Sequence, residues 1–410
     1  MRSWFRAVAS GAVLCWVAGA SAAPTPAQQA ALQAFEAHAQ ASQSDAVVVL
    51  HDGRPLLDYR RPGAPAGPIE MMSCTKSLVA LGIGRLIAQG KLRSIDQPVA
   101  DFYPEWRQGR KAAITLRMLL NHTSGLQNEP NATREVYPAP NALQLALAAE
   151  LSDAPGQRWA YNNKAMNLLA GVIEQAAHEP MDRFLQREVL DPIGVRGPSW
   201  SADSGYDKAG HPYAMAGWVA TAVGAARVGQ LVLDDGRFNG EALIDAAFVR
   251  EMLAQSQPFT PRYGLLWWRH AETSTLVVDP AGIETLAKAG VRADLLDKLR
   301  PLTDRRFADS PSLRAALTAA LGTDLPALAA SAKEHQQSLE TAMRRDLGPI
   351  VAYGAEGYLG QYIVVVPGAR LVAVRQIAAR DDWPDDKPWP YGDEGFVAHV
   401  LELARALRAP

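Results

Sequence analysis

A serine and a lysine that lie three residues apart form the first candidate for a reactive pair. Ser73 and Lys76 begin the run SCTKSLVALGI, whose apolar part predicts a helix starting near Ser73. Residues three apart share a helix face, so the hydroxyl and the ammonium can meet. A serine hydroxyl needs a base to become a nucleophile, and a lysine can be that base if burial lowers its pKa. Taken alone, the tetrapeptide is a weak pattern that recurs by chance, and an exposed helix cap is the alternative.

A second candidate is a tyrosine in the segment Tyr161-Asn162-Asn163, which follows a Pro-Gly turn at 155–156 and precedes a predicted helix over 165–176. A tyrosine beside a lysine can be held as a phenolate or readily become one. It would then move a proton between a nucleophile and a leaving group. Asn163 can hydrogen-bond a substrate carbonyl or Lys76. A packed tyrosine with a satisfied hydroxyl is the alternative.

A third candidate is the glycine-bearing segment AEGYLGQ at 355–361, which leads into a predicted strand at 362–366. Glycine just before a central strand allows another backbone to approach closely. A backbone N–H at this point could act with the N–H of Ser73 as an oxyanion hole. An ordinary bend is the alternative.

In this chain order, the three segments resemble the motifs of the serine β-lactamase and penicillin-recognising hydrolase superfamily. The most similar branch is class C-like and includes family VIII esterases, 6-aminohexanoate-dimer hydrolases and D-aminopeptidases. The stretches LLNHTSGL at 119–126 and YGLLWW at 263–268 also resemble segments of that family. The resemblance covers residues 45–268 and 350–405, most of the chain.

The resemblance implies roles for the positions that match the family's motifs: Ser73, Lys76, Tyr161, Asn163, Gly357 and Tyr358. The serine would form an acyl-enzyme, the lysine would assist its deprotonation, and the tyrosine would act as general base or acid. The asparagine would position the substrate. The N–H groups of the serine and of Tyr358 would form the oxyanion hole, with Gly357 in the glycine position. No cofactor or metal is implied.

The third motif departs from the family pattern. It usually opens with Lys or His, where this chain has Ala355. A cation there would bind the carboxylate of a β-lactam or of a D-Ala terminus, and its loss costs about 1.5–3 kcal/mol, roughly 10- to 150-fold. We therefore expect an esterase or amidase on small acyl substrates. The alternatives are a D-amino-acid peptidase or β-lactamase, with Arg375 supplying the cation, and a non-catalytic binding module.

His122 offers a competing Ser/His/Asp interpretation, with Asp96 or Asp101 as the third member. The chain has no GxSxG nucleophile elbow, which argues against that interpretation. In the resembled family this histidine stretch is structural.

Strand and helix signals at the two chain ends indicate how these residues are positioned. Hairpins are predicted at 46–59 and 362–377, and helices at 27–42 and 394–407. We expect an α+β fold in which one antiparallel sheet, completed by both termini, is flanked by helices. The expected parts are a sheet subdomain (23–70 and 350–410), a helical domain carrying both motifs and a return strand (71–270), and a helical insertion (271–349).

The N-terminus predicts a secretory signal peptide over 1–22, because two arginines precede a short apolar run that ends in Ala-Ser-Ala. We expect cleavage after Ala22 and a periplasmic or secreted protein. The 410 residues are 48% hydrophobic and 20% charged with a net charge of −2, which is ordinary globular composition without a basic field for nucleic acid. The expected partner is a small ester, amide or peptide-like molecule, without nucleic acid or stable membrane insertion. The oligomeric state is left open.

Overall fold

The computed structural model describes residues 25–197, 199–380 and 394–408, so the predicted signal peptide lies outside the described residues. Its main sheet is antiparallel, with strand order β2-β1-β13-β12-β11-β7. The strands are β1 (Ala46–His51), β2 (Arg54–Arg60), β7 (Trp268–Ala271), β11 (Ile350–Gly357), β12 (Gln361–Val366) and β13 (Leu371–Gln376). Because β1 pairs with β13, the two chain ends close one sheet, and the predicted α+β fold is confirmed.

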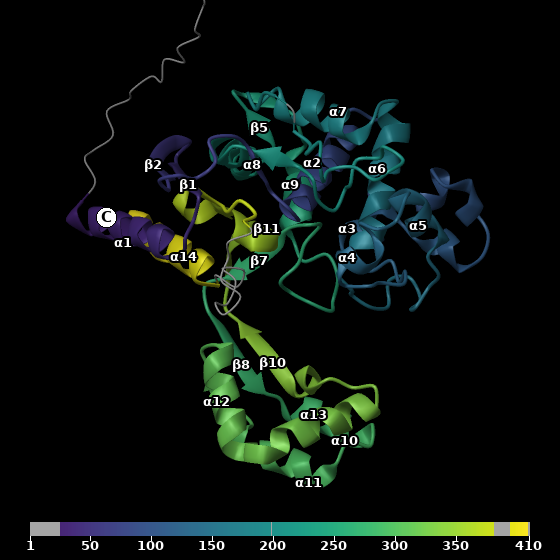
Figure 1. Ribbon diagram of the computed structural model, residues 1–410, viewed down its shortest axis with the longest axis vertical. Coiled ribbons are helices and arrows are strands. Elements are labelled where there is room, and N and C mark those ends of the chain that lie inside the picture. Colours follow the sequence, from purple (N-terminus) through teal and green to yellow (C-terminus); the bar gives the residue numbers. More distant parts are fainter. Residues whose placement is uncertain (1–24, 198, 381–393, 409–410) are drawn as a thin grey trace, which may run out of the picture.

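Both faces of the sheet are covered, since successive side chains along a strand point into two different hydrophobic cores. Val47 and Val49 of β1 pack toward the terminal helices, whereas Val48 and Leu50 pack toward the helical domain. The terminal helices are α1 (Pro26–Ala41) and α14 (Glu394–Arg408), which lie side by side (Figure 1). Phe35 of α1 and Phe396 of α14 pack against each other in a tilted arrangement, with ring centroids 5.6 Å apart. Helix α8 (Ala222–Leu233) contacts the sheet from the other side.

The helical domain is built around α2 (Cys74–Ala88), which is buried along most of its length. Helix α6 (Asn163–Ala177) packs against it. The remaining helices are α3 (Leu116–Leu120), α4 (Ala132–Glu135), α5 (Ala142–Ala148), α7 (Met181–Leu185) and α9 (Ala246–Leu253). The short strands are β3 (Ile69–Glu70), paired with β4 (Val219–Ala220), and β5 (Arg237–Phe238), paired with β6 (Glu241–Ala242). Strand β3 ends immediately before the segment that leads into α2.

The insertion has its own core and projects away from the rest of the molecule (Figure 1). Its helices are α10 (Pro280–Lys288), α11 (Ala293–Leu296), α12 (Ser310–Leu321) and α13 (Leu325–Glu334). It also contains a sheet of β10 (Met343–Leu347), β8 (Ser274–Val278) and β9 (Arg306–Phe307). The prediction of helices alone was therefore incomplete. The strands were missed because β8 and β10 continue the pairing of β7 with β11 beyond the main sheet. That pairing joins segments that lie far apart in the sequence.

One described stretch, Ser310–Glu334, is long and apolar enough to cross a membrane by length and composition alone. Gly322, with φ +54°, separates its two helices, α12 and α13. Each helix is shorter than the roughly 20 residues that span a bilayer. Leu313, Leu321 and Leu328 instead fill the core of the insertion.

Candidate active site

Ser73 is presented at the N-terminus of α2 by a tight turn after β3. The turn contains Met72 at φ +48°, a left-handed conformation that is uncommon outside glycine. It is held in place because Met71 donates its N–H to the Trp218 carbonyl at 2.7 Å. Ser73 occupies the N-cap position, yet its side chain makes no capping hydrogen bond. The hydroxyl is therefore available for other partners.

Lys76 lies one turn further along α2 and contacts this hydroxyl directly. Its Nζ donates to Ser73 Oγ at 2.8 Å and to the Met215 carbonyl at 2.8 Å. The side chain is 1% exposed, and burial lowers its pKa from 10.5 to about 7. A large fraction of Lys76 is thus neutral near pH 7, and a neutral amine can accept the proton of Ser73 Oγ.

Tyr161 joins the pair from the loop before α6. Its hydroxyl is hydrogen-bonded to Ser73, and Lys76 Nζ lies 5.0 Å from the centre of its ring. Burial raises the pKa of Tyr161, and the opposing effect of the Ser73 hydrogen bond is smaller. The resting side chain is therefore a phenol and is not held as a phenolate, and its predicted role in moving a proton stays a prediction.

His122 supports Tyr161 and takes no part in a Ser/His/Asp triad. The two ring centroids are 4.5 Å apart. Nδ1 accepts the Asn162 N–H at 3.2 Å, which assigns the proton to Nε2, and Nε2 donates to the Tyr263 hydroxyl at 3.2 Å. Burial, followed by the positive charge of Lys76, lowers the pKa of His122 to about 3. The imidazole is therefore neutral, and its contact with Tyr161 positions the phenol.

The triad's proposed acids lie elsewhere. Asp96 accepts from Arg117 at 2.6 Å, and Asp101 accepts from Arg93 at 2.6 Å. The Ser/His/Asp interpretation is excluded by these partners.

The end of β11 approaches the nucleophile closely at Gly357. A Cβ added there would lie 2.5 Å from the Met71 carbonyl oxygen, so only glycine allows this contact. The strand ends at this point, and the next residue, Tyr358, lines the same cavity as Ser73. This arrangement keeps the backbone N–H groups of Ser73 and Tyr358 as the candidates for an oxyanion hole.

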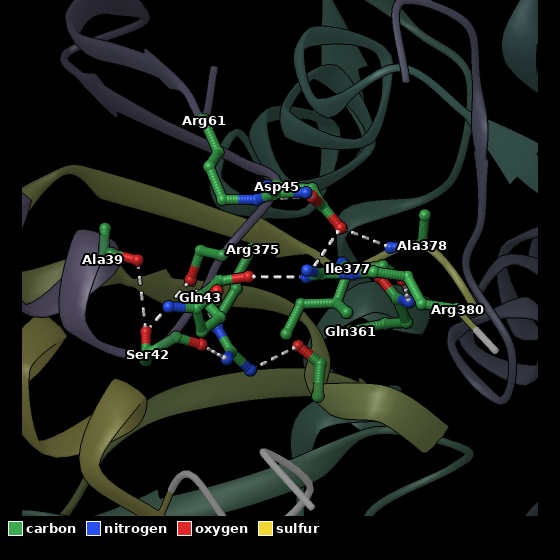
Figure 2. Close-up of polar contacts among 12 residues, drawn as sticks. Ala39, Ser42, Gln43, Asp45, Arg61, Gln361, Arg375, Ile377, Ala378 and Arg380 are labelled. Atoms are coloured by element: carbon green, nitrogen blue, oxygen red, sulfur yellow. Dashed lines mark hydrogen bonds and ion pairs between the residues drawn. The ribbon is translucent and has the colours of Figure 1, made fainter. Parts of the chain in front are cut away.

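Arg375 does not supply the missing cation. It is fully buried and donates to Ser44 Oγ at 2.8 Å and to the carbonyls of Gly360 and Ser42 at 3.0 Å each (Figure 2). The expectation that it could bind a substrate carboxylate was wrong, because its position in β13 directs the side chain into the protein interior. Its contact with Gly360 instead braces the turn that follows Tyr358. Ala355 is also fully buried.

A cavity of about 720 Å³ opens beside the nucleophile. It is lined by Glu70, Met72, Ser73, Pro130, Asn131, Ala132, Thr133, Tyr137, Asn163, Ser204, Met215, Ala216 and Tyr358. The structure thus brings Asn163 to the cavity as predicted. Glu70 and Tyr137 were missed, because neither belongs to a motif and only the folded chain places them there. Among the described residues, no group of three or more His, Cys, Asp or Glu side chains could hold a metal ion.

A family model described as beta-lactamase matches residues 32–391. The chain belongs to the β-lactamase family. The predicted resemblance is thereby confirmed for most of the sequence, including every segment that forms the site.

Two curated relatives match part of this β-lactamase-family chain. Esterase EstB of Burkholderia gladioli is 33% identical over 146 residues, which cover 31% of this chain and 36% of EstB. The putative penicillin-binding protein PbpX of Bacillus subtilis (strain 168) is 29% identical over 123 residues, which cover 30% of each protein. The chain spans about a third of the length of these relatives.

Solved structures match nearly the whole chain. A putative β-lactamase from Bacteroides dorei has a TM-score of 0.61 at 17% identity, covering 91% of this chain and 98% of that one. A putative 6-aminohexanoate-dimer hydrolase from Bacillus anthracis has a TM-score of 0.61 at 16% identity, covering 91% and 81%. At these identities the likeness establishes the shared fold.

Proposed function

We propose that this protein is a serine hydrolase that forms an acyl-enzyme on Ser73 and acts on esters or amides of small acyl groups. The observation that carries the proposal is the 2.8 Å contact between Ser73 Oγ and the Nζ of Lys76, a buried lysine whose pKa is lowered to about 7. A binding module of the same fold would gain nothing from a nucleophile paired with a base in this way.

Acylation follows from the proton states of the three side chains. Neutral Lys76 accepts the Ser73 proton while Oγ attacks the substrate carbonyl carbon, and the developing oxyanion accepts from backbone N–H groups. When the tetrahedral intermediate collapses, the bond to the leaving group breaks. The leaving group takes a proton from the Tyr161 phenol, which the Lys76 ammonium then reprotonates. Deacylation repeats these steps with water as the attacking group.

The substrate class follows from the charges on the cavity wall. The described residues that line the cavity include no lysine, arginine or histidine. Arg375 is bound elsewhere, and Ala355 stands where the family's cation is expected. A substrate carboxylate would therefore find no cation among the described lining residues, which favours esters and amides that carry no carboxylate. The esterase among the relatives supports the same choice.

The predicted signal peptide supports a periplasmic or secreted location for this activity. N-terminal sequencing of protein recovered from the periplasm or medium should start at Ala23. An N-terminus at Met1 would count against export.

Intact-mass analysis with a fluorophosphonate tests the proposal. One adduct is expected on the purified protein and none on Ser73→Ala, which should also lose p-nitrophenyl ester hydrolysis by on the order of 10³-fold or more. Residual activity within about tenfold of wild type would reveal a different nucleophile. Nitrocefin hydrolysis faster than ester hydrolysis would favour the β-lactamase alternative. The absence of both an adduct and hydrolysis would favour a binding module.

A further inference from the structure

One carboxylate forms part of the cavity wall beside the nucleophile. Glu70 ends strand β3, three residues before Ser73, and both residues line the cavity. Its Oε2 accepts from Ser204 Oγ at 2.8 Å, and its Oε1 accepts the Gly217 N–H at 3.1 Å. These two neutral donors fix the side chain at the wall without neutralising its charge.

Within the described part of the chain, no cation is paired with this carboxylate. Glu70 takes part in none of the salt bridges found among the described residues, and none of the described lining residues is basic. Lys164 directly follows the lining residue Asn163 in the sequence, but its Nζ donates to Glu135 at 2.7 Å. Burial raises the pKa of Glu70 more strongly than its two hydrogen bonds lower it. The carboxylate is thus incompletely solvated and would gain from a positive partner.

Aromatic side chains complete a surface suited to a cation. Tyr137 and Tyr358 line the same cavity and are 38% and 60% exposed. Tyr137 is held edge-on against Tyr213, with ring centroids 5.4 Å apart. Burial, and after it the negative charge of Glu70, raises the pKa of Tyr137 to about 12, so the ring stays neutral. Neutral tyrosine faces attract ammonium groups.

We propose that Glu70 makes the enzyme selective for substrates that carry a protonated amine, such as aminoacyl esters or amides. This inference rests on the proposed function. The ammonium group donates to the Glu70 carboxylate at the tyrosine-lined wall while the reacting carbonyl lies at Ser73. A neutral substrate leaves the carboxylate without its partner, and an anionic one is repelled by it.

The test compares phenyl 3-aminopropanoate with phenyl butanoate, which differ only in an ammonium group in place of a methyl group. Each kcat/KM is divided by the rate constant for hydroxide hydrolysis of the same ester, which corrects the comparison for the different intrinsic reactivities of the two esters. The wild type should prefer the ammonium ester by about 10- to 150-fold, the range for a hydrogen bond to a charged group. Glu70→Gln should reduce the ratio by a similar factor, and added salt should reduce the wild-type ratio.

Ser204→Ala is the matched control, because it removes a hydrogen bond from Glu70 but keeps the charge. The ratio should stay within about threefold of wild type if charge is the determinant. Equal effects of both variants on the ratio would reduce Glu70 to a structural residue and overturn the inference. A wild-type ratio near one, with butanoate still hydrolysed, would also overturn it and leave the proposed function intact.

If neither ester is hydrolysed and fluorophosphonate leaves no adduct, the proposed function fails. Isothermal titration of the two esters into Ser73→Ala then tests the inference by binding alone. Tighter binding of the ammonium ester would support the role of Glu70, and equal binding would refute it.

Discussion

Replacing Lys76 with methionine should abolish activity and also make the protein more stable near neutral pH. The lysine is 1% exposed, and burial lowers its pKa from 10.5 to about 7. The unfolded chain therefore binds a proton that the folded chain holds less tightly. Near pH 7 this difference costs the fold about 4 kcal/mol. Methionine has a similar length and no charge to desolvate.

The net gain is smaller than that cost, because the substitution also removes two hydrogen bonds. Those to Ser73 Oγ and to the Met215 carbonyl contribute about 1 kcal/mol each, so Lys76→Met should stabilise the fold by about 2 kcal/mol. The direction in which the stability of the wild type changes with pH follows from the lowered pKa of Lys76. Between pH about 7 and 10.5 the unfolded state binds more protons, so the wild type gains stability as pH rises and its deficit relative to the variant shrinks.

Urea unfolding at pH 7 and pH 9.5 measures the stability gain and its dependence on pH, provided that the m-values of the wild type and the variant agree. Lys164→Met is the matched control. Lys164 is 4% exposed, but its ammonium pairs with Glu135 at 2.7 Å, so its loss leaves a part-buried carboxylate without its partner and should destabilise the fold. A Lys76→Met variant that is less stable than wild type at pH 7, or whose difference from wild type is independent of pH, would refute the reasoning.

Two further predictions concern the reaction itself. Because Lys76 must be neutral to accept a proton, kcat/KM for phenyl butanoate should fall about tenfold per pH unit below pH about 7; a flat profile from pH 5 to 8 would point to another base. Gly357→Ala should lower kcat by more than about tenfold, because the added Cβ would lie 2.5 Å from the Met71 carbonyl and displace the end of β11. Steady-state kinetics at saturating ester would contradict this if kcat stayed at the wild-type value.

The contact between the nucleophile and its lysine was predictable because it is local. Ser73 and Lys76 are three residues apart on one helix, and helix geometry alone brings such side chains together. The closure of the sheet by both chain ends was also predictable, since the continuously apolar strands and the amphipathic helices at the ends need each other to bury their apolar surfaces. The participation of Tyr161 came from resemblance, as no local rule joins residues that lie so far apart in the sequence.

Tertiary structure decided which way the side chains around the site point and which of them are charged. The same arginine could serve a substrate or the interior, and only the pairing of β13 with its neighbours turns Arg375 toward Gly360. Likewise, Tyr161 remains a phenol because the surrounding chain excludes water from it. Which groups could react was evident from the sequence, because residue types and local spacing can be read along the chain. Packing decided which are ionised and which face the cavity, because desolvation and long-range contacts exist only once distant segments meet.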